Sequence, residues 1–277
     1  MTGETVRYEA DGPIARVTLD RPQRHNALNP RAMRRLGEIW HDFMLARELR
    51  VAVLSGEGPS FCSGMDIGET HPGFGYLPEA AARQDDVERD AARRHEALPG
   101  ERRRLLYVPP PELGKPVIAA LHGRVSGGGL ELALACDLRI AAEGTVFALP
   151  EVTRGIIPTS GAIYWLPRIV GLGRALELLL TGESLDAEEA LRIGLVNKLV
   201  PRDLLDEAAS AMAQRIARNA PLAVQALRDA VIRSSGAGAH EGLAIAENLG
   251  RNLRTTADYA EGFRAFAEKR APDFSGR

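Results

Sequence analysis

The sequence lacks the usual marks of a secreted, membrane or metal-binding protein. Its 277 residues contain two cysteines, Cys62 and Cys136, too few for a disulfide framework or a tetrahedral cysteine zinc site. It has no run of eighteen or more apolar residues, and its first residues lack the basic segment and apolar stretch of a signal peptide. We therefore expect a cytoplasmic protein with two buried thiols, no metal site and no membrane contact.

Other absences exclude further classes of function. The formal net charge is −2 and no basic run with interleaved aromatic residues occurs, so we expect no nucleic-acid partner. Neither G-x-G-x-x-G nor G-x-x-x-x-G-K-[ST] is present, which argues against dinucleotide and nucleoside triphosphate sites. Hydrophobic residues make up 45% and charged residues 26%, which is typical of a soluble globular protein.

The order of the apolar patterns predicts an α/β protein. From Pro201 onward the spacing is helical, and earlier segments alternate short β-rich runs with helices. We expect a core at 1–200, in which segment 69–112 is the least readable part and includes a charged helical stretch at 79–98, and a helical region at 201–277. The predicted strands lie at 5–8, 14–19, 51–54, 117–121, 138–142, 145–149 and 195–200.

Capping residues place several of the helices. Asn29 followed by Pro30 predicts a helix start with asparagine as N-cap, and Gly182 and Gly194 stand at helix ends. A short helix after Glu151 is expected to be capped by Thr159 or Ser160. The predicted helices lie at 30–46, 172–180, 187–193, 204–219, 222–232, 241–253 and 258–269.

Two glycine-bearing turns, each following an apolar strand, indicate a chemical site. FCSGMDI at 61–67 follows the 51–54 run, and GRVSGGGLE at 123–131 follows the 117–121 run. If parallel strands place these turns side by side, the backbone N–H groups of Met65 and Gly128 could converge on one carbonyl oxygen. Glu131 and Glu151 would then lie near such an oxyanion site as acid and base, although either turn alone is also explained by ordinary strand-to-helix turn chemistry.

These motifs resemble the crotonase (enoyl-CoA hydratase/isomerase) superfamily over almost the whole chain. The resemblance is to the two-glutamate hydratase type of that family. It is carried by RPQRHNALN at 21–29, FCSGMDI at 61–67, KPVIAALHGRVSGGGLELALACDLRIA at 115–141, FALPEVTRGIIPTSGA at 147–162, GLGRALELLLTGESLDAEEALRIGLVNKLVP at 171–201 and EGFRAFAEKRAPDFSGR at 261–277.

The resemblance implies a fold, an assembly and a substrate. The fold would be a spiral of ββα units followed by helices that assemble a homotrimer, commonly paired into a hexamer. A coenzyme A thioester would be the substrate, with no bound cofactor, and residues 69–112 would be a variable acyl-pocket segment. The Met65 and Gly128 N–H groups would form the oxyanion hole, Glu131 would activate water and Glu151 would protonate Cα.

The resemblance also implies where coenzyme A binds. Phe266 and Lys269 occupy positions that in relatives approach the adenine end, often from a neighbouring subunit. The groove near the thioester would be formed by Arg24, Asn26, Ala27, Leu28, Ser63, Asp66 and Ile67.

Three functions stay open at the level of sequence. Both glutamates favour hydration of a 2-enoyl-CoA to a 3-hydroxyacyl-CoA. The bulky Met65 and the GAIYWL segment at 161–166 depart from the simple hydratases, and they keep an enoyl-CoA isomerase or a specialised lyase or hydrolase open. The third is a non-catalytic assembly or RNA-binding homologue, which the near-neutral charge and the intact glutamates disfavour.

Overall fold

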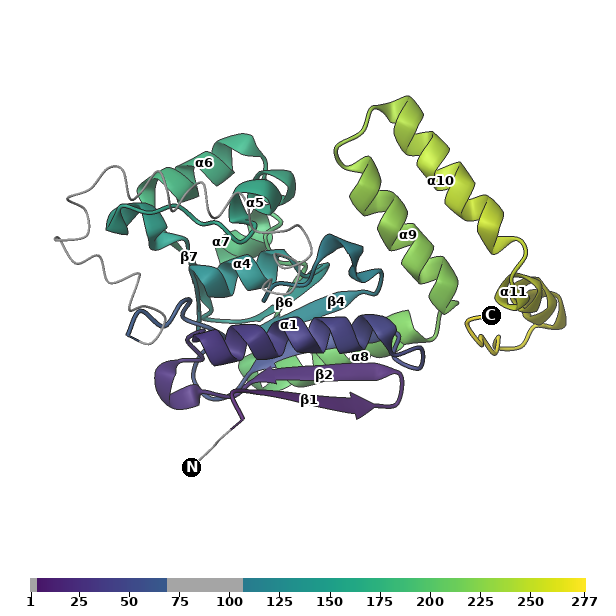
Figure 1. Ribbon diagram of the computed structural model, residues 1–277, viewed down its shortest axis with the longest axis horizontal. Coiled ribbons are helices and arrows are strands. Elements are labelled where there is room, and N and C mark those ends of the chain that lie inside the picture. The colour runs from purple at the N-terminus through teal and green to yellow at the C-terminus, as the bar shows by residue number, and fades with distance from the viewer. Residues whose placement is uncertain (1–3, 69–106) are drawn as a thin grey trace, which may run out of the picture.

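A computed structural model describes residues 4–68 and 107–277, and its central feature is a six-stranded sheet (Figure 1). The strands lie in the order β1-β2-β3-β4-β6-β9. The first two form an antiparallel hairpin, and every later pair of neighbours is parallel. The strands are β1 (Val6–Asp11), β2 (Ile14–Leu19), β3 (Val51–Gly56), β4 (Val117–Leu121), β6 (Leu138–Ala142) and β9 (Lys198–Val200).

A second, three-stranded sheet makes the chain a spiral. It contains β5 (Arg124–Ser126), β7 (Val146–Ala148) and β8 (Ser184–Leu185) in that order. The pairs β4–β5 and β6–β7 each place their first strand in the large sheet and their second in the small one. A helical segment follows each pair, α4 (Gly128–Leu134) and η4 (Pro150–Arg154), so the expected ββα units are present.

The first long helix, α1 (Pro30–Leu45), begins where the sequence predicts. The Asn29 side chain accepts a hydrogen bond from the Ala32 N–H at 2.9 Å, which satisfies one of the free donors of the first turn. The other helices are η1 (Pro22–Arg24), η3 (Pro111–Leu113), α5 (Ala162–Val170), α6 (Leu172–Thr181), α7 (Ala187–Arg192), η5 (Arg202–Leu204), α8 (Leu205–Ala217), α9 (Pro221–Ser234), α10 (Ala239–Leu253) and α11 (Ala257–Glu268).

Both faces of the large sheet are buried, which explains the continuous apolar runs of its central strands. Side chains alternate along a strand, so Ala52 and Leu54 of β3 enter the core on the α1 side. Val51 and Val53 enter a second core, where α8 covers the other face. Helix α8 therefore packs on the sheet of the core, although its residues belong to the helical region predicted at 201–277.

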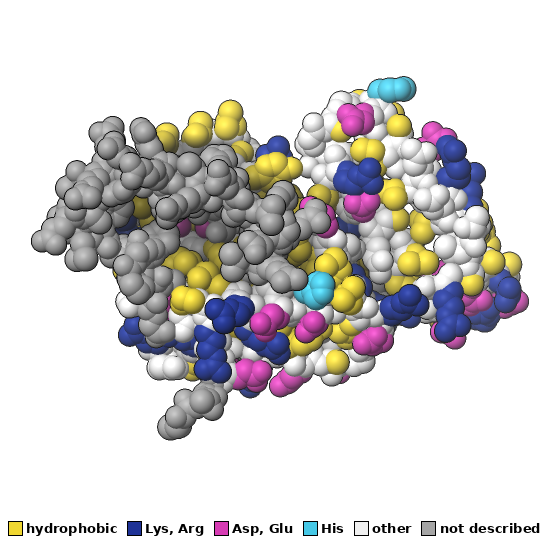
Figure 2. Space-filling view, in the orientation of Figure 1, with side chains coloured by type: hydrophobic (Ala, Val, Ile, Leu, Met, Phe, Trp, Pro, Cys, Tyr) yellow, Lys and Arg dark blue, Asp and Glu magenta, His cyan; other side chains and the backbone are white. Residues whose placement is uncertain are grey.

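Helices α9–α11 extend away from the sheet as an arm (Figure 1). Helix α10 packs along α9, and large apolar side chains remain exposed on the arm, as the space-filling view shows (Figure 2). Among them are Leu227, Val231, Leu243 and Phe263, each more than 60% exposed. The predicted division at residue 200 and its role in assembly stay predictions.

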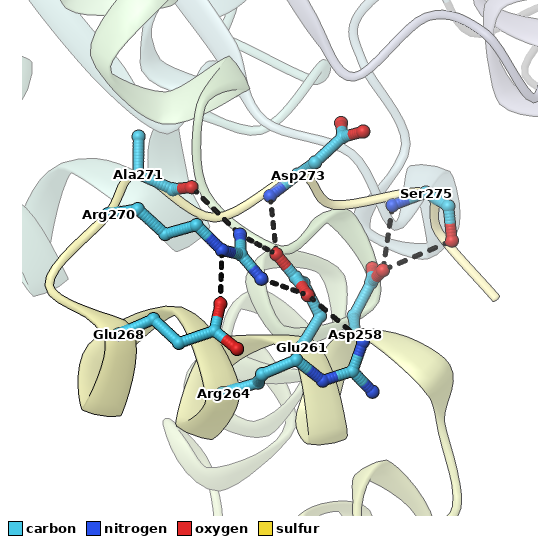
Figure 3. A network of polar contacts seen from close by, with 8 residues as sticks. All are labelled: Asp258, Glu261, Arg264, Glu268, Arg270, Ala271, Asp273 and Ser275. Carbon is cyan, nitrogen blue, oxygen red and sulfur yellow. Dashed lines mark hydrogen bonds and ion pairs between the residues drawn. The ribbon is translucent and has the colours of Figure 1, made fainter.

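The last residues fold back onto α11 through a polar network (Figure 3). The buried Asp258 carboxylate accepts hydrogen bonds from the N–H groups of Ser275 and Gly276, at 2.7 and 2.9 Å. Arg270 pairs with Glu261, and this hydrogen-bonded ion pair holds the pKa of Glu261 at about 2. These hydrogen bonds hold the last residues of the chain against α11.

The structure corrects one cap and adds two short strands, β5 and β8. Helix α5 begins at Ala162 after Gly161 and has no side-chain cap, so the predicted capping by Thr159 or Ser160 is wrong. Strand β5, only three residues long, was not predicted because it lies inside the glycine-rich turn. Both cysteines are buried as predicted, and burial raises the pKa of the Cys62 thiol to about 12.

Two further sequence predictions concern the charged stretch and the membrane. The helix expected at 79–98 lies outside the described residues, as does most of segment 69–112. No helix in 4–68 or 107–277 combines the length and hydropathy needed to cross a bilayer.

Candidate active site

A cavity of about 600 Å³ lies beside the first turn of α4. Three segments form most of its wall: the loop after β3, the glycine turn before α4, and the chain from η4 to the start of α5. The lining includes Ser63, Gly64, Met65, Ile67, Tyr107, Ser126, Gly127, Gly128, Glu131, Glu151, Arg154 and Ser160.

Backbone pairing holds the two glycine-bearing turns side by side. Strands β3 and β4 are parallel neighbours, so both turns leave the same edge of the sheet. The Cys62 N–H donates to the Arg124 carbonyl, and the Ser126 N–H donates to the Cys62 carbonyl, at 3.1 and 3.0 Å. The Leu28 N–H donates to the Gly64 carbonyl at 2.7 Å and ties the other side of the loop.

The backbone N–H groups of Met65 and Gly128 are among the cavity donors that have no acceptor within the described part of the chain. Gly128 stands in the first position of α4, where a helix leaves its N–H groups unbonded. A Cβ atom on Gly64 would lie 3.4 Å from the Gly128 nitrogen, which shows how closely the two turns approach. The positive end of α4 faces the same space.

Two glycines of the triplet, Gly127 and Gly129, are required because neighbouring atoms leave no room for a side chain. Gly127 has φ +52°, and a Cβ atom there would lie 3.1 Å from Glu151 Oε1. A Cβ atom on Gly129 would lie 2.5 Å from the Cys62 carbonyl oxygen, closer than atoms can pack. Side chains are therefore excluded where α4 meets the β3 loop and the Glu151 carboxyl.

Glu131 reaches the cavity from the first turn of α4. Its Oε1 accepts hydrogen bonds from the Ser160 and Ala162 N–H groups, at 2.6 and 3.2 Å. Burial raises the pKa of Glu131, these bonds lower it, and the nearby Glu151 charge raises it, so the net shift is upward. The backbone bonds orient this carboxyl and leave Oε2 for another partner.

Glu151 reaches the cavity from η4 and has fewer hydrogen bonds than Glu131. It is 8% exposed, and its buried Oε2 atom has no hydrogen-bond partner. Burial raises the pKa of Glu151, against the opposing effects of its own backbone N–H and of Arg154. A buried carboxyl with an unsatisfied oxygen favours its protonated form. The cavity thus brings together a glutamate held by two backbone N–H groups and a glutamate whose Oε2 atom has no partner among the described residues.

Tyr107 is a site residue that the sequence analysis did not find. It is 5% exposed, lines the cavity, and places its hydroxyl 3.4 Å from the Gly128 carbonyl. Burial raises the pKa of Tyr107, and Glu131 raises it further, so the phenol stays protonated. Tyr107 lies within segment 69–112, the least readable part of the sequence, and no motif marks it.

The expected coenzyme A groove divides into exposed and buried residues. Arg24, Ser63 and Ile67 retain accessible surface, and Ile67 is 71% exposed. The buried Ala27 contributes its backbone, whose carbonyl accepts a hydrogen bond from Arg21 at 2.5 Å. Their predicted contacts with the ligand stay predictions.

Three of the expected groove residues have buried side chains. Asn26 is 2% exposed, and its side chain bonds the Arg21 N–H and the carbonyls of Glu57 and Ser60. Asp66, 4% exposed, pairs with Arg21 and Arg24, and Leu28 is fully buried. Their side chains are already used inside the protein, and their predicted contacts with the ligand stay predictions.

Phe266 and Lys269 do not line this cavity. Both stand at the end of α11, on the arm, and neither belongs to the cavity wall (Figure 1). Phe266 is 84% exposed. A role for them at coenzyme A would require an adjacent copy of the chain, and it stays a prediction. Among the described residues, no group of three or more histidine, cysteine or acidic side chains is placed to hold a metal ion.

Comparisons with known proteins identify relatives over almost the whole chain. Residues 9–277 match the family described as Enoyl-CoA hydratase/isomerase. The crystal structure of enoyl-CoA hydratase from Bacillus anthracis superposes with a TM-score of 0.83 at 35% identity, covering 99% of this chain and 100% of that one. The enoyl-CoA hydratase from Mycobacterium tuberculosis H37Rv gives 0.83 at 34% identity, with 99% of each chain covered.

Curated relatives cover the chain just as fully. (E)-benzylidenesuccinyl-CoA hydratase from Thauera aromatica is 38% identical over 272 residues, which is 98% of this chain and 99% of that protein. Carnitinyl-CoA dehydratase from Citrobacter koseri is 36% identical over 278 residues, 99% of each.

The spiral of ββα units and the full-length structural matches define an α/β protein of the crotonase fold, as the sequence predicted. More closely, the chain belongs to the enoyl-CoA hydratase/isomerase family.

Proposed function

We propose that the protein is a lyase that adds water to a 2-enoyl-CoA and forms a 3-hydroxyacyl-CoA. The observation that carries this proposal is the meeting of two unbonded N–H groups, on Met65 and Gly128, with the carboxyls of Glu131 and Glu151 in one cavity. Family membership supports the coenzyme A thioester as the substrate, with no bound cofactor.

The two N–H groups would hold the thioester carbonyl oxygen as an oxyanion hole. Addition at Cβ drives electron density onto that oxygen, and the enolate-like transition state carries more charge there than the substrate does. Hydrogen bonds from Met65 and Gly128 would therefore strengthen during the reaction and lower its barrier.

The two glutamates would divide the proton transfers. Glu131, held by the Ser160 and Ala162 N–H groups, accepts a proton from water as its oxygen bonds to Cβ. Glu151, whose raised pKa favours the acid form, donates a proton to Cα. The sum is one water added across the double bond, and the proton on Glu131 returns to Glu151 through solvent.

The relatives support water chemistry. One is named a hydratase and another a dehydratase, which are the two directions of one reversible reaction. An isomerase needs only one proton shuttle at this site and leaves the second carboxyl without a task. Retention of both Glu131 and Glu151 therefore favours hydration.

The proposal is tested with crotonyl-CoA and longer 2-enoyl-CoA thioesters. We expect Glu131→Gln and Glu151→Gln each to lower kcat by roughly 100- to 10,000-fold. Glu143→Gln, at an exposed glutamate outside the cavity, is the matched control and should retain activity. Unchanged turnover in either cavity variant would refute its assigned role.

The isotope of water separates hydration from isomerisation. In heavy-oxygen water the hydratase reaction places label on the product's 3-hydroxyl, which mass spectrometry detects. An isomerised product without oxygen label would replace our proposal with enoyl-CoA isomerase activity.

Binding of the coenzyme A moiety and assembly belong to the same proposal. The ligand would be contacted near the thioester by Arg24, Asn26, Ala27, Leu28, Ser63, Asp66 and Ile67. Phe266 and Lys269 would approach the adenine end of coenzyme A on an adjacent copy in a trimer or hexamer.

A further inference from the structure

Arg154 is the cation of the cavity. Among the described residues that line it, Arg154 is the single lysine, arginine or histidine. It is exposed, and its guanidinium makes no salt bridge or hydrogen bond within the described part of the chain. The neighbouring wall is apolar and includes Ile67, Ile156, Ile157 and Pro158. An unpaired guanidinium beside such a wall is suited to an acidic group on the ligand.

The position of Arg154 follows from the short helix that carries it. Glu151 and Arg154 stand three residues apart in η4, a 3₁₀ helix. Side chains at this spacing eclipse one another, about 6 Å apart along the axis, so both emerge on the cavity side. The charge of Arg154 lowers the pKa of Glu151, as expected for neighbouring groups on one short helix.

The free charge of Arg154 is consistent with the chemistry of Glu151. No salt bridge joins the two side chains, and burial favours a protonated, neutral Glu151. A neutral acid leaves the guanidinium charge uncompensated while the substrate is bound. An anion a few bonds from Cα would lie within reach of Arg154.

We propose that Arg154 recognises a carboxylate on the acyl chain, so that the preferred substrates are acidic 2-enoyl-CoA thioesters. This inference rests on the proposed hydratase function and names its substrate class. A cationic acyl group would be repelled at the same position, and a neutral one would gain nothing from it.

The test compares two thioesters that differ only in this charge, glutaconyl-CoA and its methyl ester. We expect the parent enzyme to favour the free acid by about tenfold in kcat/KM, as one charge-assisted contact at a partly exposed site allows. Arg154→Gln should remove the preference and Arg154→Lys should keep part of it. Arg215→Gln, at an exposed arginine on α8, should leave it unchanged.

The ratio between the two substrates isolates recognition from other effects. Both carry the same coenzyme A, so contacts of Arg154 with its phosphates cancel, and so does any influence of Arg154 on Glu151. Equal kcat/KM values for the parent, or an unchanged ratio in Arg154→Gln, would overturn the inference and leave the hydratase proposal standing.

A second measurement covers failure of the proposed reaction. If the parent hydrates neither these two thioesters nor crotonyl-CoA and its longer homologues, the hydratase proposal falls. Calorimetric binding of glutaryl-CoA and its methyl ester to the parent and to Arg154→Gln then decides the inference alone. Tighter binding of the acid that depends on Arg154 supports it, and equal binding overturns it.

Discussion

Glu151 shows at the scale of one residue how a reactive group lowers stability. Its Oε2 atom is buried without a partner, and burial raises its pKa. A carboxyl with a raised folded-state pKa contributes stability below its unfolded pKa, and this contribution is lost as pH rises through the folded value. At neutral pH the ionised form therefore opposes folding.

We predict that Glu151→Gln is more heat-stable than the parent at pH 7. Glutamine is nearly the same shape and carries no charge to desolvate. The difference in Tm should shrink as pH falls below about 4, where the parent carboxyl is protonated in both states. Thermal melts followed by circular dichroism measure this, and a lower Tm for the variant at pH 7 would contradict it.

Gly127 tests whether activity depends on the space beside Glu151. We predict that Gly127→Ala loses most of its kcat, because its Cβ would displace Glu151 Oε1 from 3.1 Å away. Gly144→Ala is the control, since Gly144 has φ +74° and no atom within 4 Å. Both variants should lose stability, because each places a side chain at a positive φ. Equal activity in the two variants would show that the contact with Glu151 is unimportant.

At the scale of the element, α4 is anchored at its carboxyl end by Arg139. This side chain is 5% exposed and donates from Nε to the Leu195 carbonyl and from Nη1 to the Cys136 carbonyl, both at 2.7 Å. A longer contact reaches the Ala133 carbonyl at 3.4 Å. A cation at the negative end of the helix, near β9, fixes the axis that carries Glu131.

We predict that Arg139→Met lowers the free energy of unfolding by about 3 kcal/mol, because it leaves buried carbonyls without donors. Urea denaturation measures the change. Arg124→Met, at an exposed arginine of β5, is the control and should be within about 0.5 kcal/mol of the parent. A similar, small change in both variants would mean that Arg139 does not hold the helix end.

At the scale of the whole molecule, the arm of α9–α11 exposes several large apolar side chains. A cavity of about 480 Å³ on the arm is lined by Tyr259, Phe263, Phe266 and Phe274. Exposed apolar patches of this kind mark contacts between protein chains. Together with the family resemblance, they support assembly through the arm.

We predict a trimer or hexamer in solution, measured by sedimentation equilibrium. Phe263→Glu should reduce the mass toward that of one chain, because it places a charge within the apolar patch. Leu45→Glu changes an equally exposed side chain at the end of α1, 64% against 63%, and should retain the parent mass. A monomeric parent would contradict assembly, and an unchanged Phe263→Glu mass would exclude this patch.

The features predicted correctly from the sequence are those that adjacent residues determine, and the features missed are those that depend on contacts between distant residues. The Asn29 cap and the strand at 51–54 were predicted because a few adjacent residues determine them. The α5 cap was mistaken because the Ser160 N–H donates to Glu131, a residue distant in sequence. Tyr107 was missed because only folding brings it to Gly128.

The sequence by itself determined the family, the α/β class and the identity of the paired glutamates, since these depend on adjacent residues and on motif spacing. Only the tertiary structure decided which groups are free to act. Within residues 4–68 and 107–277, packing left the Met65 and Gly128 N–H groups and Glu151 Oε2 without partners, while it used Asn26 and Asp66 internally. Hydrogen-bond satisfaction and burial arise from contacts between distant segments, which no local pattern contains.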